Sequence, residues 1–185
     1  MSTNHTAKRP DRFEHYLNRA EVAAERSTCL RRKIGAIIVS VDGVELSSGY
    51  VGSPRGTAHC TDTGRCLRKE LKIPPGERYE LCRSVHAEQN TLINAARTGV
   101  SVVGAEMFIS SERIRSAYDS SRGENDRIYG PCMICKKMII NAGITKVHMR
   151  EKGVGVRSYD IEELKDLLAQ EEDEIREALS PQGTF

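Results

Sequence analysis

Residues 131–149 read PCMICKKMIINAGITKVHM, and this stretch indicates the class of fold. Positions 132–142 have the apolar spacing of a helix, and Gly143 is the residue type that commonly ends one. Residues 145–149 then continue as a short strand. A helix followed at once by a strand is a unit of α/β domains.

The same alternation continues outward along the chain. A strand at 105–110 follows a helix at 87–97 that ends at Gly99, and Asp42-Gly43 forms the turn of an earlier β-hairpin. The remaining predicted elements are a helix at 11–26 capped by Asp11, strands at 34–40 and 44–48, and an amphipathic helix from 159 to about 178 capped by Asp160. The order predicts an α/β sandwich with helices on both sides of the sheet.

Two segments break the alternation. Residues 49–83 are rich in Gly, Pro, Cys and charge, which indicates a long loop that is functional or held by a bound group. Residues 111–130 form a polar excursion with four arginines that either line the phosphate side of a pocket or belong to a solvated loop. These are Arg113, Arg115, Arg122 and Arg127.

Length and composition set the class of protein. The 185 residues, 38% hydrophobic and 29% charged, predict one soluble domain over 1–185, with flexible ends at about 1–10 and 180–185. Without an apolar leader or a membrane-spanning run we expect a cytoplasmic protein, no membrane partner and reduced thiols. The six cysteines are therefore metal ligands or buried thiols, and a net charge of +2 gives no reason to expect a nucleic-acid partner.

Four residues form a candidate catalytic centre. Cys132 and Cys135 lie one helical turn apart, and His86-Ala87-Glu88 begins the other helix. An H-x-E motif followed by P-C-x-x-C is the pattern of zinc deaminases of nucleobases. His86, Cys132 and Cys135 would bind Zn²⁺ and leave one position open for water, while Glu88 moves protons. Alternatively, the cysteines belong to a structural zinc clip, and His86 and Glu88 are ordinary helix residues.

The surrounding residues make the chain resemble the deoxycytidylate deaminases of the cytidine deaminase superfamily. The resemblance extends over about two thirds of the chain and is carried by residues 27–38, 48–56, Cys60, 85–97 and 131–144. It implies a three-layer α/β/α sandwich with a mixed sheet of about five strands. It also implies conversion of dCMP to dUMP, a small nucleotide as substrate, and assembly into a homo-oligomer.

The resemblance further suggests substrate contacts. Arg97 aligns with a family arginine that binds the substrate phosphate, although a solvated charge at the helix end is the alternative, and Ser27 and Arg31 are weaker candidates. Val51 stands where the family usually has an asparagine, so this position cannot hydrogen-bond the sugar hydroxyl through its side chain.

The remaining cysteines are candidates for a second, structural zinc. Cys29 and Cys60 fall where some family members bind a second ion, and four thiols are the right donors for a tetrahedral site. Idle or buried thiols are the alternative. The four residues are Cys29, Cys60, Cys66 and Cys82.

Other functions fit the sequence less well. A deaminase of another cytosine nucleotide or nucleoside is the nearest alternative. A polynucleotide or adenosine-type deaminase would need a basic track with aromatic residues, but the chain has no Trp and only 5% aromatic residues. A non-catalytic zinc- or nucleotide-binding homologue is the third alternative, and the presence of Glu88 argues against it.

Overall fold

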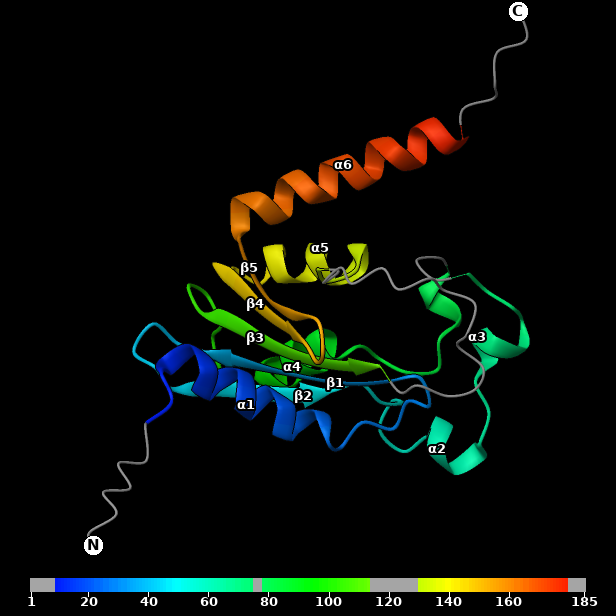
Figure 1. The fold of residues 1–185 in the computed structure, drawn as a ribbon, viewed down its shortest axis with the longest axis horizontal. Helices are drawn as coiled ribbons and strands as arrows, with labels where there is room; N and C mark the ends of the chain where they lie inside the picture. Colours follow the sequence, from blue (N-terminus) through cyan, green and yellow to red (C-terminus); the bar gives the residue numbers. More distant parts are fainter. Residues whose placement is uncertain (1–8, 75–77, 114–129, 180–185) are drawn as a thin grey trace, which may run out of the picture.

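The computed structural model describes residues 9–74, 78–113 and 130–179 of the chain. Its centre is a five-stranded sheet in the order β2-β1-β3-β4-β5 (Figure 1). The strands are β1 (Arg32–Val39), β2 (Glu45–Tyr50), β3 (Glu106–Arg113), β4 (Lys146–Glu151) and β5 (Gly155–Asp160).

The sheet is mixed, as expected. β1 pairs antiparallel with both β2 and β3, β3 pairs parallel with β4, and β4 pairs antiparallel with β5. Parallel neighbours need a crossover connection, and a helix makes it here. Gly43 has a φ of 85° in the predicted hairpin turn between β1 and β2.

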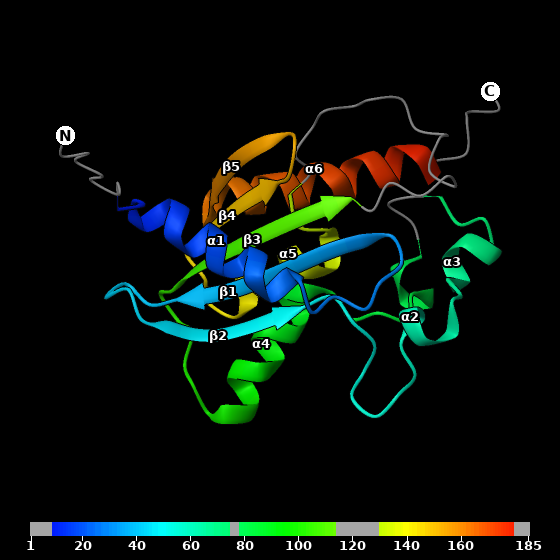
Figure 2. The same ribbon diagram turned by 60° about the horizontal axis from the view of Figure 1, so that its bottom comes forward.

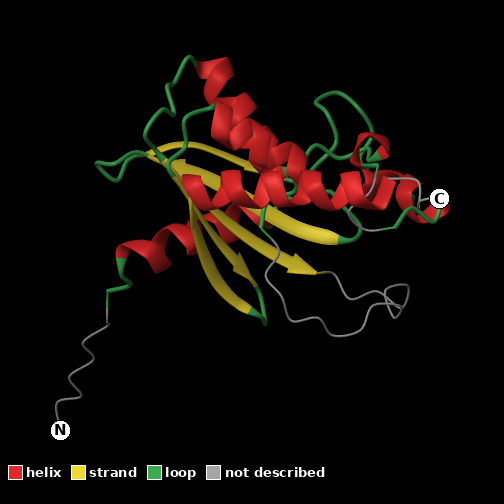
Figure 3. Cartoon of the chain, turned by 90° about the horizontal axis from the view of Figure 1, so that it is seen from above, coloured by secondary structure: helices red, strands yellow, loops and turns green. Residues whose placement is uncertain are grey.

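Helices cover both faces of the sheet. The N-terminal helix lies on one side of the strands, and helices of the other layer lie on the opposite side (Figure 3). The long helices are α1 (Arg12–Ala24), α4 (Ala87–Thr98), α5 (Met133–Asn141) and α6 (Ile161–Leu179). α1 packs on β1 and β3, α4 packs on β2 and β1, and α6 packs on α5.

The buried side chains of β1 alternate between the two layers. Ala36 and Ile38 face the larger core under α4 and α5, whereas Ile37 and Val39 face the smaller core under α1. This period of two is what a strand with both faces covered requires. The predicted α/β/α sandwich is thereby confirmed.

Two glycines allow the helices to approach the sheet closely. A Cβ atom at Gly35 would lie 2.2 Å from the backbone oxygen of Ala20 in α1, and one at Gly49 would lie 2.6 Å from the backbone nitrogen of Thr91 in α4. Side chains then fix α4 on β2, because Asn90 donates to the oxygen of Tyr50 at 2.8 Å and Asn94 donates to the oxygen of Ser48 at 2.8 Å. α4 is thus held on the sheet by a close approach of the two backbones and by two hydrogen bonds from its side chains.

The two predicted helix caps, Asp11 and Asp160, are confirmed. The backbone nitrogen of Glu14 donates to the Asp11 carboxylate at 2.7 Å, and that of Glu163 donates to the Asp160 carboxylate at 2.9 Å. The last helix nevertheless begins at Ile161, because Tyr159 belongs to β5 and is buried in the sheet. That fifth strand had no individual prediction.

Two further segments differ from the sequence-based expectations. The polar excursion begins later than residue 111, because β3 continues through Arg113 and buries Ser111. The segment predicted as a loop from 49 to 83 contains the end of β2 and three short helices. These are α2 (Cys60–Thr63), α3 (Leu67–Glu70) and the 3₁₀ helix η1 (Tyr79–Leu81).

Some predictions concern residues that the structure does not describe. Residues 1–8, 114–129 and 180–185 lie outside the described part of the chain, and with them the predicted flexible ends and most of the polar excursion. Within the described residues, no helix combines the length and apolarity needed to cross a membrane.

Candidate metal centre and active site

Two helix starts create the candidate site. His86 is the N-cap of α4, and Cys132 is the N-cap of α5. The two helices contact each other on the same face of the sheet, and their N-termini carry partial positive charge that favours anionic groups. Residues 46 positions apart in the sequence therefore meet.

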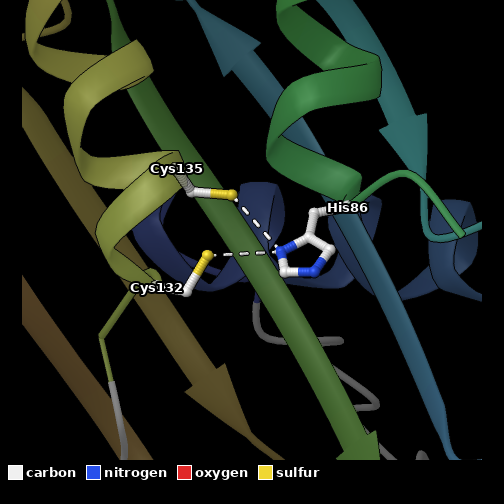
Figure 4. Close-up of side chains that lie close together, drawn as sticks. All are labelled: His86, Cys132 and Cys135. Carbon is white, nitrogen blue, oxygen red and sulfur yellow. Dashed lines mark hydrogen bonds between the residues drawn. The ribbon is translucent and has the colours of Figure 1, made fainter. Parts of the chain in front are cut away.

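The three predicted ligands converge on one point. Nδ1 of His86 lies 3.4 Å from Sγ of Cys132 and 3.4 Å from Sγ of Cys135 (Figure 4). All three donor atoms lie within 4.8 Å of one another. Among the described residues, it is the one group of at least three His, Cys, Asp or Glu side chains whose donor atoms lie close enough together to hold a metal ion.

The geometry fits zinc. Zn–S bonds of about 2.3 Å and a Zn–N bond of about 2.0–2.1 Å at a tetrahedral angle place sulfur and nitrogen about 3.6 Å apart. The observed separations of 3.4 Å agree with that value. One imidazole and two thiols leave a fourth position, as catalytic zinc sites require.

The two thiols share a proton in the metal-free group. The hydrogen bond from Cys135 lowers the pKa of Cys132 to about 4, while the same contact raises the pKa of Cys135. Burial lowers the pKa of His86, but the Cys132 contact and the charge of Glu88 outweigh it, so that the pKa of His86 is raised. A bound cation would replace the shared proton, because a coordinating thiol is deprotonated.

Glu88 lies beside these ligands without belonging to the ligand group. Its side chain is buried, with the residue 7% exposed, and it lies in the first turn of α4. Burial raises the pKa of Glu88, partly offset by the positive charge of His86. A buried carboxyl group whose pKa is raised is suited to general acid–base work.

Two residues that the sequence did not single out hold His86 in place. The ring of Tyr79 packs edge-on against the His86 ring with centroids 5.2 Å apart. The backbone nitrogen of His86 donates to the Gln89 side chain at 3.0 Å. A glutamine at the third helical position is a capping signal that could have been recognised, whereas the Tyr79 contact depends on the tertiary fold.

Two of the other four cysteines, Cys60 and Cys66, stand at the starts of α2 and α3, and these short helices lie beyond one end of the sheet (Figure 2). The backbone nitrogen of Thr61 donates to the oxygen of Thr28 at 3.3 Å, which places Cys60 beside Cys29. Sγ of Cys60 lies 4.0 Å from Oγ of Ser84, close to Cys82. Burial raises the pKa of Cys60, and the charges of the other three cysteines raise it further.

We call Cys29, Cys60, Cys66 and Cys82 the four-cysteine cluster. All four are free thiols. Among the described residues they do not form a second group whose donor atoms all lie within 4.8 Å. The fold thus brings the four together as neighbours at a wider spacing than the first group.

The predicted substrate contacts lie in different places. Arg97 is exposed in the last turn of α4, about 16 Å along the helix from His86 by the standard rise per residue. The Ser27 hydroxyl is bonded to the backbone nitrogen and oxygen of Ile34, at 3.1 and 3.2 Å. Arg31 is half-buried, and its backbone nitrogen donates to Sγ of Cys29 at 3.5 Å.

Val51 lies next to a residue that pairs with the segment before His86. It is buried, and the neighbouring Gly52 pairs with Val85, the residue before His86. Of the four predicted loop arginines, Arg115, Arg122 and Arg127 lie outside the described residues, and Arg113 ends β3.

Known proteins share this arrangement. A family profile described as "Cytidine and deoxycytidylate deaminase zinc-binding region" matches residues 10–151. A deoxycytidylate deaminase of Mycobacterium phage D29 is 32% identical over 75% of this chain and 94% of its own length. The dCMP deaminase of cyanophage S-TIM5, solved in complex with dCMP and dUMP, is 29% identical with a TM-score of 0.55, covering 88% of this chain and 93% of its own.

Other relatives are longer. The deoxycytidylate deaminase of Schizosaccharomyces pombe is 30% identical over 75% of this chain, and the match spans 37% of its length. The matched region of this chain contains β1 to β4 and His86, Glu88, Cys132 and Cys135. The chain therefore belongs to the cytidine and deoxycytidylate deaminase family.

Proposed function

We propose that the chain catalyses the zinc-dependent hydrolytic deamination of a cytosine nucleotide, converting dCMP to dUMP with release of ammonia. The observation that carries the proposal is the group of His86, Cys132 and Cys135 with the buried Glu88 carboxyl beside it. The relatives named for dCMP deamination, one solved with dCMP and dUMP, support this substrate.

The residues divide the chemistry between them. His86, Cys132 and Cys135 would hold Zn²⁺, and the ion would supply Lewis-acid chemistry that makes water a better nucleophile at neutral pH. Glu88 accepts a proton from the attacking water and delivers it to N3 of the ring. It then takes the proton of the new hydroxyl group at C4 and passes it to the amino group, so that the C4–N bond breaks, ammonia leaves and a carbonyl oxygen remains at C4.

A substrate panel tests the proposal. Zinc-loaded protein is mixed with dCMP, dCTP, CMP or deoxycytidine, and ammonia release is measured together with the ultraviolet change from cytosine to uracil. We expect turnover of dCMP above the others. Absence of ammonia from all four compounds, with zinc bound, would refute deamination and favour a non-catalytic nucleotide-binding homologue.

Val51 is the observation that favours a different cytosine nucleotide. Its side chain has no hydrogen-bonding group, and its backbone is already used, because its nitrogen donates to Ile34 at 2.9 Å and its oxygen accepts from Thr28 at 3.1 Å. Val51→Asn should shift kcat/KM toward the deoxynucleotide if this position faces the sugar. An unchanged preference across the panel would show that Val51 does not contact it.

We also propose that the four-cysteine cluster binds a second, structural Zn²⁺. Its support is the convergence of four thiols from distant segments, together with Nδ1 of His59, a buried atom without a hydrogen-bond partner next to Cys60. Zinc analysis should then give two ions per chain. One ion per chain would refute the second site and leave the deaminase proposal intact.

The single domain, the cytoplasmic location and the homo-oligomeric assembly expected from the sequence stay predictions. Sedimentation of the zinc-loaded chain tests the assembly.

A further inference from the structure

Arg68 is a buried charge that the deamination chemistry does not use. It lies on α3 and is 4% exposed. Its Nη1 atom is buried and has no hydrogen-bond partner, and among the described residues no carboxylate forms an ion pair with it. A buried charge is tolerated only when a partner compensates it, so this guanidinium indicates a negative group nearby.

Two neutral contacts hold the guanidinium in place. Nη2 donates to the oxygen of Pro74 at 2.8 Å. Cζ lies 4.7 Å from the centroid of the Tyr79 ring, which is a cation–π distance. Both contacts fix the orientation of the side chain, but neither carries a charge that balances it.

Two thiols of the four-cysteine cluster lie close to Arg68. Cys66 is two residues earlier, at the N-cap of α3, and Cys82 follows η1, the short helix that begins with Tyr79. Although burial has the largest effect and raises the pKa of Cys82, the charge of Arg68 acts on it in the opposite direction. The guanidinium therefore lies within electrostatic reach of the four-cysteine cluster.

The charge of a zinc-loaded cluster is opposite in sign to that of Arg68. Four thiolates around one Zn²⁺ leave a net negative charge that is costly to bury. Partners around metal-bound thiolates lower that cost by hydrogen bonds and opposite charge. Nη1 is an N–H donor without a partner. A thiolate sulfur can accept more than one hydrogen bond, so Nη1 could add to existing contacts such as that from the Arg31 nitrogen to Sγ of Cys29.

We propose that Arg68 is the counter-charge of the four-cysteine cluster and donates through Nη1 to its metal-bound thiolates. The inference rests on the second zinc proposed above. Arg68 is a positioning residue in this role, since it acts on the ligands and not on the ion. The buried, unpartnered Nη1 atom is what distinguishes it from the other arginines of the segment, such as Arg65, which is ion-paired with Glu70 at 2.8 Å and exposed.

The test compares Arg68→Met with Arg65→Met, which removes one positive charge from the same segment. Purified chains are analysed for zinc, and the ions are then titrated out with a chromogenic chelator. We expect two ions in the parent chain and at least tenfold weaker retention of one of them in Arg68→Met. Arg65→Met should retain both ions as the parent does, and Arg68→Lys should recover part of the loss because it restores the charge.

A double variant assigns the effect to the cluster. In a Cys82→Ser background the cluster cannot load fully, so the added Arg68→Met change should no longer weaken zinc retention. The melting temperature of each variant, measured with and without chelator, separates loss of metal from loss of folding. If a variant and the parent have the same melting temperature with chelator present, but the variant melts lower when chelator is absent, the variant has lost only the stabilisation that the metal provides.

The alternative outcomes are distinct. One zinc in the parent chain would refute both the second site and this inference, while dCMP turnover would keep the deaminase proposal. Two ions that Arg68→Met retains as firmly as the parent would refute the inference alone. If that variant instead raises KM for dCMP tenfold and keeps both ions, Arg68 serves the nucleotide phosphate and the inference is wrong.

Discussion

Replacing Glu88 by glutamine should abolish catalysis while the metal centre is retained. Glu88 and Glu151 are the buried carboxylates among the described residues, and Glu151 is ion-paired with Arg32 elsewhere in the fold. Of the two, Glu88 is therefore the one in position to move the protons. General acid–base catalysis contributes about 10²–10⁴-fold, and we expect the upper end, a fall in kcat of about 10³–10⁴-fold or roughly 4–5.5 kcal/mol.

The same change should stabilise the metal-free protein near neutral pH. Burial raises the pKa of Glu88 above its ordinary value of 4.5, so the folded state binds more protons than the unfolded chain above that pH. Stability is then fully present below pH 4.5 and declines as pH rises through the folded pKa. Glutamine carries no charge, and the Glu88→Gln variant should not show this decline in urea titrations.

Glu151→Gln is the matched control, because the two carboxylates are 5% and 7% exposed. Arg32 lies 3.2 Å from Glu151 with its own side chain 34% exposed. Solvent screens part of this pair, so we expect a loss of about 1–2 kcal/mol in stability. The kcat per bound zinc should not change.

The assays are ammonia release, zinc content and urea unfolding on the same preparations. Glu88→Gln with full zinc and more than a tenth of the parent kcat would refute the proton-transfer role. Loss of zinc in this variant would show that Glu88 belongs to the ligand set.

Three further predictions concern the scaffold. Burial lowers the pKa of His148 below 6.5, so the unfolded state binds more protons, and stability should fall as the pH drops below 6.5. His148→Gln should make the free energy of unfolding less dependent on pH in urea titrations at pH 7 and 5. An equally steep fall in the variant would refute the role of His148. Lys136 is 3% exposed and pairs with Glu171 at 2.5 Å. Glu171→Leu leaves the buried lysine without its partner, and after allowance for the exposure of Glu171 it should lower the free energy of unfolding by about 1–2 kcal/mol. Addition of Lys136→Met should recover most of that loss, and additive losses would contradict the pairing. Gly49→Ala should push α4 away from the sheet, because the alanine Cβ would lie 2.6 Å from the Thr91 nitrogen. The melting temperature should therefore fall. An unchanged melting temperature would show that the backbone moves to accept the methyl group without cost.

The strongly patterned elements could be predicted from the sequence. The helices at α1, α4 and α5 carry caps or terminal glycines, and the β1–β2 hairpin carries its turn dipeptide. β5 could not be recognised, because five of its six residues are exposed and Tyr159 is its buried one. An edge strand without apolar alternation leaves little signal, and Tyr159 therefore looked like the start of the helix that follows.

Some residues of the candidate site could also be predicted from the sequence, and others could not. His86 with Glu88, and Cys132 with Cys135, are local patterns whose spacing has a chemical reason, and so the sequence could reveal them. The contact of Tyr79 with His86 and the burial of Arg68 arise only when segments distant in the chain meet. Their residue types have many surface roles, and spacing alone does not separate those roles.

The position of Cys132 has a consequence for protein engineering. It is the N-cap of α5 and makes no side-chain hydrogen bond to the helix start, although Ser, Thr, Asp and Asn are the residues that stabilise this position, by about 0.5–2 kcal/mol over alanine. A design procedure that maximises helix stability would therefore select Cys132→Ser and obtain a firmer apo-protein without a catalytic centre. Stability and activity make opposite demands at this residue, so an engineer seeking a more robust deaminase should exclude it from the search and improve the caps that bear no ligand.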